Sequence, residues 1–342
     1  LDSFRDLGKP VFEAVDPLKI FKYIESEPQY RKYVILMSGD TGFFSGAKRL
    51  QDYLRKWNPQ VIPGVSTLSY LCSRTGISYD DAYVMSLHGR EGNIASVVRR
   101  NKKTFILTDG RNNAAYICER LNRFGLGNVR TTIGQRLSYP DEKIFSGTAI
   151  ELADGEYDPL CGVLIENDIT TGWNNNTEAS GLAKDETIIS TSGPGMADEL
   201  FIRNVSEGKT VPMTKKEVRA ICMSIMCVAE DSICWDVGAG TGSVSVEMAA
   251  QAYKGMVYAI EKRDEAVDLI NKNAIRFHLD NIKTVSGSAP QVLEELPAPT
   301  HVFVGGSSGN IKEIIRTVIR KNPHAVIAAT AVSLEAISEL TT

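Results

Sequence analysis

Residues Ile233–Gly242 read Ile-Cys-Trp-Asp-Val-Gly-Ala-Gly-Thr-Gly, an apolar stretch that runs into a glycine-rich turn. Ile233–Val237 is apolar enough to predict a buried strand, and the glycines after it predict a tight turn into a helix over Ser243–Tyr253. Glycine tolerates positive φ in such a turn and lets a ligand approach the backbone where a Cβ would collide. A second apolar stretch, Met256–Ile260, predicts the next strand, and it ends on the acid Glu261.

The turn and the acid together predict a cofactor site. An acid at the tip of the second strand lies where the ribose hydroxyls of a nucleotide-type cofactor would be placed. Gly238, Gly240 and Gly242 follow the spacing Gly-x-Gly-x-Gly, whereas a pyrophosphate suits Gly-x-Gly-x-x-Gly. We therefore expect an adenosyl ligand without phosphates, and S-adenosylmethionine (S-adenosyl-L-methionine) is the obvious candidate. The alternative is that the turn, which also contains Ala239 and Thr241, only connects a strand to a helix.

From Ile233 onward, apolar strands alternate with amphipathic helices. The further strands we expect are Ile282–Val285, His301–Val304 and Ala325–Ala329, and the helices between them are Asp264–Phe277 and Asn310–Arg320. Regular alternation of this kind predicts an α/β fold in which helices cover both faces of a parallel sheet. Ligands of such sheets bind at the carboxyl ends of the strands, where the glycine turn and the acid both lie.

The first half of the chain is also mixed α/β. Its expected strands are Tyr33–Met37, Thr104–Thr108, Val129–Ile133 and Cys161–Glu166, and its expected helices are Gly46–Trp57 and Val65–Arg74. Residues 168–186 are polar and form the most loop-like stretch of the sequence. We therefore place the domain break near residue 190, which divides the chain into a domain over 1–190 and a domain over 191–342.

Length and composition are those of a soluble two-domain protein. The chain has 342 residues, of which 43% are hydrophobic and 23% charged. No apolar run reaches the length of a membrane span and no signal peptide opens the chain, so we expect a cytoplasmic protein without a membrane partner. The net charge of −4 argues against a nucleic-acid partner, because no basic surplus is available to neutralise phosphates.

Cysteine and histidine usage argues against a metal site. The six cysteines are scattered in apolar stretches and form no Cys-x-x-Cys pair, so we expect reduced core residues. None of the four histidines is paired with another at ligand spacing.

Two loops of the first half carry polar residues where a ligand would bind. Ser38–Gly46 follows an expected strand and precedes an expected helix, so the backbone at Gly39 and the carboxylate of Asp40 are suited to a polar cofactor. The alternative is an ordinary βα turn in which Asp40 or Ser45 caps the helix. In the next such loop, Ser66 is favoured as the N-cap of the following helix.

Two further motifs allow both a functional and a structural interpretation. Ser86–Arg90 places His88, a glycine and Arg90 in an expected loop, where Arg90 fits either a substrate carboxylate or solvent. In the second half, Thr214–Glu217 has the pattern Thr-x-x-Glu, which predicts a capping box for a helix over Lys215–Val228. A contact between this threonine and a cofactor would be a second role in addition to capping the helix.

Small residues follow two of the strands expected in the second half. Ala289 lies in a Gly-Ser-Ala turn after the third strand, where an adenine would find space against small side chains. Gly305, Gly306 and Ser307 begin a run of small residues after the fourth strand. That run predicts close approach by a bulky substrate, and the alternative is a plain flexible turn.

The second half resembles class I (Rossmann-like) S-adenosylmethionine-dependent methyltransferases, and more narrowly the decarboxylating methylase domain of cobalamin biosynthesis. The residues that carry this resemblance are Met213–Arg219, Asp236–Ser243, Tyr258–Glu261, Gly287–Pro290 and Phe303–Ser307. The first half is similar to the tetrapyrrole methylase family through Ser38–Ser45, Pro63–Ser66, Ser86–Arg90 and Leu107–Asp109. The pairing of the two domain types in this order is far more specific than the glycine turn alone.

The resemblance implies two methyl transfers, to C5 and C15 of a corrin precursor, and loss of carbon dioxide from the acetate at C12. It assigns C15 and the decarboxylation to the C-terminal domain and C5 to the N-terminal domain. Carried over by position, the cofactor contacts are Thr214, Gly238–Gly242, Glu261 and Ala289 in the C-terminal domain and Gly39, Asp40, Ser66 and Thr108 in the N-terminal domain. The substrate contacts would be His88, Arg90, Gly305, Gly306 and Ser307, and Arg219 is a further candidate for a substrate carboxylate.

The resemblance assigns no catalytic side chain. The meso carbon of the macrocycle is electron-rich and needs no protein nucleophile, so catalysis would depend mainly on proximity and alignment. Precursors with and without cobalt both fit the sequence. Both domain types commonly self-associate, which makes a homo-oligomer an open expectation.

The sequence departs from these families at both ends. The tetrapyrrole methylase family opens with a strand and a Gly-x-Gly-Pro-Gly loop that has no counterpart in this chain. A class I methyltransferase fold usually adds two more strands after the fifth. We therefore expect a chain truncated at both ends. Two other functions fit the glycine turn: a class I methyltransferase acting on RNA or protein, and a non-catalytic module that binds S-adenosylmethionine.

Overall fold

The computed structural model describes residues 8–87, 92–167, 194–203, 210–306, 309–331 and 337–338. The chain divides into two compact units, each considered by itself below. The first unit comprises Leu1–Asp80 with Gly134–Lys143, and the second comprises Asp81–Ile133 with Ile144–Thr342.

The described residues of the first unit contain three short helices. They are α2 (Pro17–Ser26), α3 (Ala47–Leu54), which continues into the 3₁₀ turn η1 (Arg55–Trp57), and α4 (Thr67–Thr75). α2 starts at a proline because its N-cap, Asp16, accepts a hydrogen bond from the backbone of Leu18 at 2.9 Å. α2 packs on α3, and the rings of Phe21 and Trp57 lie 5.6 Å apart between them.

The strand expected over Tyr33–Met37 is wrong, because these residues form no strand in the structure. Val34 is 74% exposed and Leu36 is 51% exposed, so the stretch is not buried either. Apolar composition favours an extended backbone, but a strand also needs a neighbour that satisfies its N–H and C=O groups. The described residues supply no such neighbour here, and Ser38–Gly46 therefore precedes a helix without following a strand.

The second unit contains a first five-stranded sheet with the order β1-β2-β5-β3-β4. Its strands are β1 (Ala82–Ser86), β2 (Lys103–Leu107), β3 (Arg130–Gln135), β4 (Lys143–Thr148) and β5 (Cys161–Glu166). β2 pairs in parallel with β1 and antiparallel with β5. The strands expected near β2, β3 and β5 are confirmed, whereas β1 and β4 were not expected, and none of the residues of these two strands is fully buried.

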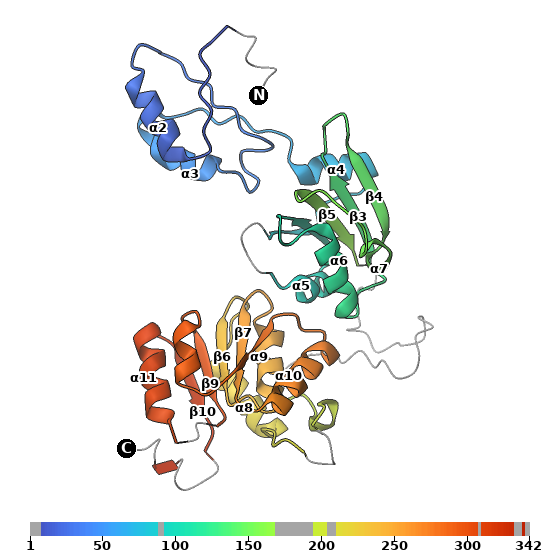
Figure 1. Cartoon of the computed structure of the whole chain (residues 1–342), viewed down its shortest axis with the longest axis vertical. Helices are drawn as coiled ribbons and strands as arrows, with labels where there is room; N and C mark the ends of the chain where they lie inside the picture. The colour runs from blue at the N-terminus through green and yellow to red at the C-terminus, as the bar shows by residue number, and fades with distance from the viewer. Residues whose placement is uncertain are drawn as a thin grey trace. The chain divides into compact units, whose positions relative to one another are not determined.

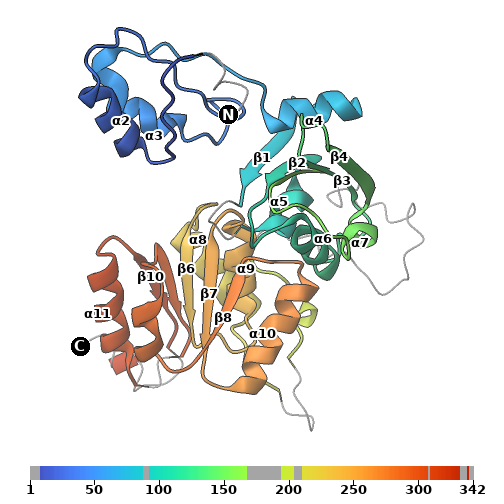
Figure 2. The same ribbon diagram turned by 45° about the horizontal axis from the view of Figure 1, so that its top comes forward.

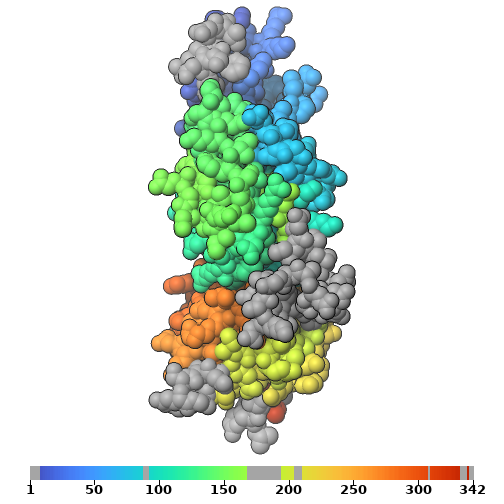
Figure 3. Space-filling model, turned by 90° about the vertical axis from the view of Figure 1, so that its right-hand side faces the viewer, coloured from blue at the N-terminus to red at the C-terminus, as the bar shows by residue number. Residues whose placement is uncertain are grey.

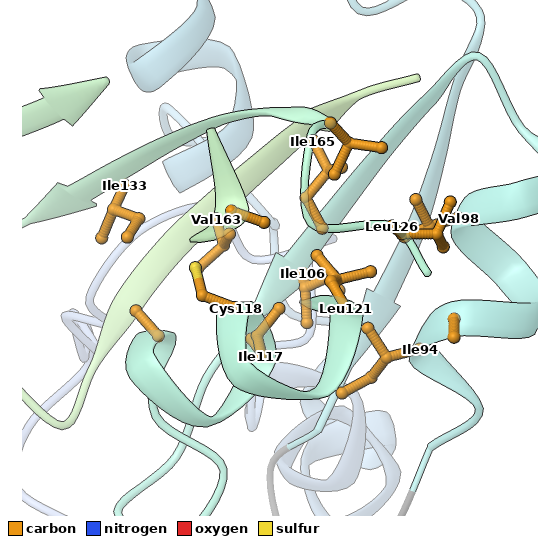
Figure 4. Close-up of a cluster of buried hydrophobic side chains, with 14 of the residues drawn as sticks. Ile94, Val98, Ile106, Ile117, Cys118, Leu121, Leu126, Ile133, Val163 and Ile165 are labelled. Carbon is orange, nitrogen blue, oxygen red and sulfur yellow. The ribbon is translucent and has the colours of Figure 1, made fainter. Parts of the chain in front are cut away.

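Two helices, α5 (Ile94–Arg100) and α6 (Ala114–Arg123), close the core of this sheet, and α7 (Ala149–Leu152) follows β4. Figure 4 shows the aliphatic side chains of α5 and α6 directed towards those of β2, β3 and β5. Ile106, Ile117 and Val163 are all completely buried. A continuous apolar cluster of this kind is the main stabilising contribution to the sheet.

The second sheet has the order β10-β9-β6-β7-β8 and is parallel throughout. Its strands are β6 (Ile233–Val237), β7 (Met256–Glu261), β8 (Ile282–Ser286), β9 (His301–Val304) and β10 (Val326–Ala329). Its helices are α8 (Lys216–Met226), α9 (Ser243–Gln251), α10 (Asp264–Arg276) and α11 (Ile311–Lys321), and the short 3₁₀ helices η2 (Asp198–Leu200) and η4 (Gln291–Glu295) accompany them. Every strand and helix predicted in this half is confirmed to within about two residues.

Helices cover both faces of the second sheet, as Figures 1 and 2 show. Cys234 and Val257 of the sheet pack with α8 and α9 in one apolar cluster. Trp235 and Val302 point the other way and pack with α11 and η4. The chain leaves β6 towards β7 on one side and reaches β9 on the other, so the strand order reverses between β6 and β9. Crevices at such reversal points are the usual ligand sites of open α/β sheets.

A buried carboxylate fastens α5 and α6 to the second sheet within the second unit. Asp280 accepts hydrogen bonds from the backbone of Ala95 at 2.9 Å and of Ser96 at 3.2 Å, and from Arg120 Nε at 2.9 Å. The Asp280 side chain is fully buried. Its negative charge therefore lies in the first turn of α5, where it is favoured by the free N–H groups of the helix.

Candidate cofactor site

A cavity of about 580 Å³ lies at the carboxyl ends of β6, β7, β8 and β9. Its size is within the range of small-molecule sites. Eight of the residues predicted as cofactor or substrate contacts line it: Thr214, Gly238, Ala239, Gly240, Glu261, Ala289, Gly305 and Gly306. Thr241 and Gly242 belong to the same turn but do not line the cavity, and Thr241 is only 1% exposed.

The glycine turn is held by its own backbone hydrogen bonds. The N–H groups of Gly238 and Ala239 both donate to Ile260 O at 3.0 Å, and Gly242 N donates to Ala239 O at 2.8 Å. Gly238, Gly240 and Gly242 all have positive φ, which residues with a side chain rarely adopt. The sequence prediction of a tight turn between β6 and α9 is therefore confirmed.

A second backbone segment of the protein packs so closely on Gly238 that no side chain would fit there. A Cβ at this position would lie 2.7 Å from Gly306 O and 2.8 Å from Gly306 N. The turn after β6 therefore packs directly on the turn after β9, at the point where the strand order reverses. At this glycine the close neighbour is the protein's own backbone, whereas the sequence interpretation had invoked a ligand.

Glu261 ties the tip of β7 to the glycine turn. Its Oε2 accepts a hydrogen bond from Gly240 N at 2.9 Å, and its Oε1 accepts from the backbone of Lys262 and of Arg263 at 3.1 Å and from Arg263 Nε at 3.2 Å. Burial alone would raise the pKa of Glu261, but the bonds from the Arg263 side chain and from the Gly240 and Arg263 backbones outweigh it and lower that pKa. The site thus holds an ionised carboxylate at neutral pH.

Asp236, directly before the turn, has a different environment. It is 1% exposed, Ser245 donates a hydrogen bond to its Oδ2, and its Oδ1 is buried without a hydrogen-bond partner in the described structure. Burial raises the pKa of Asp236 to about 7. The permanent negative charge beside the glycine turn is therefore that of Glu261.

The predicted capping box at Thr214 is wrong. α8 begins one residue later than the pattern required, its N-cap is Lys215, and no side chain caps it. The Thr214 carbonyl instead accepts a hydrogen bond from the Arg219 guanidinium, while Lys215 O accepts the first helical bond from Arg219 N at 2.9 Å. Thr214 is thereby presented to the cavity and is not part of the helix start.

Arg219 is not available to a substrate carboxylate, so that prediction is also wrong. Its side chain is completely buried and bonds Glu247 Oε1 at 2.7 Å and Asp198 Oδ1 at 2.8 Å. An arginine in the first turn of a helix is expected on the surface unless a partner far along the chain draws it inward. The sequence does not reveal Glu247 as that partner.

The predicted residues of the N-terminal site are engaged in local structure. Asp40 Oδ1 accepts from Gly42 N at 3.0 Å, and a Cβ at Gly64 would lie 2.3 Å from Gly39 O, so these two loops of the first unit touch. Ser66 is confirmed as the N-cap of α4, accepting from Ser69 N at 3.0 Å.

Thr108 lies in the second unit, where it follows β2. Its hydroxyl donates to Pro159 O at 2.8 Å and accepts from Cys161 N at 2.6 Å. Cofactor contacts by these N-terminal residues remain predictions. His88, Arg90 and Ser307 lie outside the described residues.

The cavity also has cationic residues that the sequence reasoning missed. Lys215, Lys262 and Arg263 line it, and the side chains of Lys215 and Arg263 are 63% and 50% exposed. Asn310 and Thr330 complete this side of the lining. Lys262 and Arg263 directly follow the predicted acid, so their position after a strand end was the available signal.

Five of the six cysteines are buried, as expected of core residues, whereas Cys227 at the end of α8 is exposed. Among the described residues, no group of three or more His, Cys, Asp or Glu side chains is arranged to hold a metal ion. In the same part of the chain, no helix combines the length and the apolar character that crossing a membrane requires.

A parallel α/β sheet with a glycine turn at its reversal point and an acid at the tip of the adjacent strand is the design of a class I methyltransferase domain. The family model described as "Precorrin methyltransferase domain" matches residues 207–342, and the model described as "Tetrapyrrole (Corrin/Porphyrin) Methylases" matches residues 19–153. A probable cobalt-precorrin-6B C(15)-methyltransferase (decarboxylating) of Pyrobaculum calidifontis is 42% identical over 146 residues, covering 42% of this chain and 73% of the relative. The chain belongs to the family of decarboxylating precorrin methyltransferases.

A second relative matches both halves of the chain. The precorrin-6Y C(5,15)-methyltransferase [decarboxylating] of Sinorhizobium sp is 27% identical over 308 residues, which cover 89% of this chain and 70% of the relative. Among solved structures, a precorrin-6y C5,15-methyltransferase of Geobacter metallireducens is 34% identical, covers 43% of this chain and 75% of its own, and has a TM-score of 0.39. The two family models and the Sinorhizobium relative, which spans both halves, confirm the resemblance to a fusion of two methylase domains.

Proposed function

We propose that this chain methylates C5 and C15 of precorrin-6Y, or of its cobalt-containing counterpart, with S-adenosylmethionine as donor, and removes the C12 acetate carboxyl as carbon dioxide. The observation that carries the C-terminal half of this proposal is the cavity between the β6 and β9 turns, with the ionised Glu261 at its edge. The names of the two relatives support the substrate and the decarboxylation.

The residues present fit the donor. Glu261 Oε2 accepts a single hydrogen bond from the described residues, so it retains a lone pair for a ribose hydroxyl. Gly287 and Ala289 keep the adjacent wall free of large side chains. Thr214 and the turn Gly238–Gly240 would face the rest of the donor. When bound, S-adenosylmethionine supplies an electrophilic methyl group.

The role of the chain is to bind and align the two reactants. The cavity holds no Ser–His or Cys–His pair among its lining residues, and attack by an electron-rich ring carbon requires none. Fixing donor and acceptor in line converts a bimolecular step into an effectively unimolecular one. The rigid backbone contact between Gly238 and Gly306 serves this purpose, because it fixes the spacing of the two turns that bound the cavity.

The cations at the mouth suit a polycarboxylate substrate. Lys215 and Arg263 line the cavity and keep about half or more of their side chains exposed, although each also has an acidic neighbour. Lys215 Nζ lies 3.4 Å from Asp198 Oδ2, which is a loose pair that an incoming carboxylate can displace. A corrin precursor carries several acetate and propionate groups, and positive charge at the mouth attracts them.

The proposal is tested by incubating the protein with precorrin-6Y and S-adenosylmethionine and measuring the molecular mass of the macrocyclic product by mass spectrometry. A gain of two methyl groups with loss of one carbon dioxide supports the full activity. A gain of one methyl group with loss of carbon dioxide restricts the activity to the C-terminal domain. Donor binding without any change in the macrocycle would contradict the proposal and favour a non-catalytic binding module.

A further inference from the structure

The segment over residues 194–203, which precedes the sheet of the donor cavity, is held by buried polar side chains. At its start, the Glu247 carboxylate of α9 accepts hydrogen bonds from Gly195 N at 2.8 Å and Met196 N at 3.0 Å. Glu247 is 1% exposed, so its charge requires a partner. Arg219 of α8 is that partner, at 2.7 Å.

Arg219 connects the start of the segment to the cavity wall. Its guanidinium donates to Met196 O and to Asp198 Oδ1 on the segment, and also to Thr214 O. It also lies over the ring of Phe201, 4.8 Å from the ring centre. Thr214 lines the cavity, so one buried side chain fixes both the segment and this wall.

Asn273 of α10 connects the end of the segment to the glycine turn. Its Oδ1 accepts from Ile202 N at 2.8 Å, and its Nδ2 donates to Ile202 O at 3.0 Å and to Thr241 O at 2.8 Å. The side chain is completely buried. Thr241 lies between the two turn glycines Gly240 and Gly242, so the same amide holds the segment and the turn.

The segment is also hydrogen-bonded to the residues that come directly before the cavity-lining stretch in the sequence. Val211 N donates to Arg203 O at 3.0 Å, and Pro212, which lines the cavity, places its carbonyl 3.2 Å from where a Cβ of Gly240 would lie. The surface view in Figure 3 shows the yellow atoms of this part of the chain bordering the orange atoms around α10. These contacts form a continuous chain of interactions from Thr214 through residues 194–203 to Thr241.

From this chain of interactions we infer that Arg219 and Asn273 are positioning residues for the methyl donor. This role rests on the proposed donor site: the 194–203 segment sets the separation of the Thr214 wall and the glycine turn. Groups held by fully bonded buried networks move little, and small displacements of a binding wall lower affinity. Neither residue lines the cavity, so both act through the backbone of Thr214 and Thr241.

The test compares two buried asparagines. Asn281 is as buried as Asn273 and also donates to two carbonyls, Ala249 O at 2.9 Å and Ala252 O at 2.8 Å, but neither carbonyl belongs to the cavity or its turn. Asn273→Ala and Asn281→Ala should lower the melting temperature to a similar extent. We expect the Kd for S-adenosylhomocysteine, measured by calorimetry on the full chain, to rise about tenfold in Asn273→Ala only.

A second pair covers the case in which Asn273→Ala does not fold. Arg219→Lys keeps the charge beside Glu247 but cannot reach Thr214 O and Met196 O together, so it should also weaken binding about tenfold. Arg276→Ala removes the bond from Arg276 Nε to Leu200 O at 2.8 Å, which holds the same segment without touching the cavity, and should leave the Kd within about twofold. A folded Arg219→Lys or Asn273→Ala with unchanged affinity overturns the inference alone. Absence of binding by the unaltered protein overturns the proposed donor site and the inference together.

Discussion

Substitution of Gly238 by alanine tests the packing of the two turns that bound the cavity. The new Cβ would lie 2.7 Å from Gly306 O, 2.8 Å from Gly306 N and 2.9 Å from Gly306 Cα, all of which are backbone atoms. No flexible side chain can move aside, so one of the turns must shift. The residue also has φ of +76°, which costs an alanine about 1–2 kcal/mol.

The two contributions set the expected size of the effect. Relief of the backbone overlap adds about 1–3 kcal/mol, so Gly238→Ala should lower the free energy of unfolding by about 2–5 kcal/mol. For a domain of this size, that corresponds to a fall in Tm of about 5–15 °C. Urea denaturation and thermal melting measure the loss.

A matched control lies across the same contact. Among the described residues, a Cβ at Gly306 would meet only Gly238 Cα, at 4.0 Å, and Gly306 has no positive φ. Gly306→Ala should therefore cost less than about 1 kcal/mol. Equal destabilisation by the two substitutions, or none by Gly238→Ala, would refute the argument that this turn is fixed by backbone packing.

Three further predictions concern charged or titratable groups. Glu261→Gln removes the ionised acceptor of the cavity and should weaken S-adenosylhomocysteine binding by about 10- to 100-fold in calorimetry. Unchanged affinity would show that this carboxylate does not contact the donor. Burial, assisted by Arg99, lowers the pKa of His278 from 6.5 to about 4. The unfolded chain therefore binds more protons between these values, and stability should fall by about 3 kcal/mol as the pH drops through this window. His278→Asn, which tolerates the left-handed backbone at this position, should flatten that dependence in urea titrations, and an unaltered pH profile would contradict it. Asp280→Asn removes a buried charge from Arg120 and should cost about 3 kcal/mol, whereas a loss below about 1 kcal/mol would show that the charge is not needed.

The fold of the second half was predictable because its signals are local. β6 and β9 agree with the predicted bounds to the residue, since each is an apolar run that ends in glycines. Tyr33–Met37 has the same apolar character and forms no strand, because strand formation depends on a partner that composition does not reveal. Local pattern therefore identifies a candidate strand but not its pairing.

Several residues that line the cavity were predictable from the sequence, whereas the buried residues that hold its walls in place were not. Gly240 and Glu261 were identified from spacing, and the structure joins them by a hydrogen bond. The contact of Arg219 with Glu247 spans 28 positions, and that of Asn273 with Ile202 spans 71. Such pairs have no sequence signature, so Arg219 was assigned to a substrate and Asn273 was missed.

The fate of the donor's methyl group distinguishes a C5,15-methyltransferase from a protein that only binds the donor. The protein is incubated with precorrin-6Y and S-adenosylmethionine labelled with ¹³C in its methyl group, and the product is analysed by mass spectrometry and NMR. We expect label on C5 and C15 and loss of the C12 carboxyl as carbon dioxide. A macrocycle that remains unlabelled, while the unaltered protein binds the donor, would contradict it.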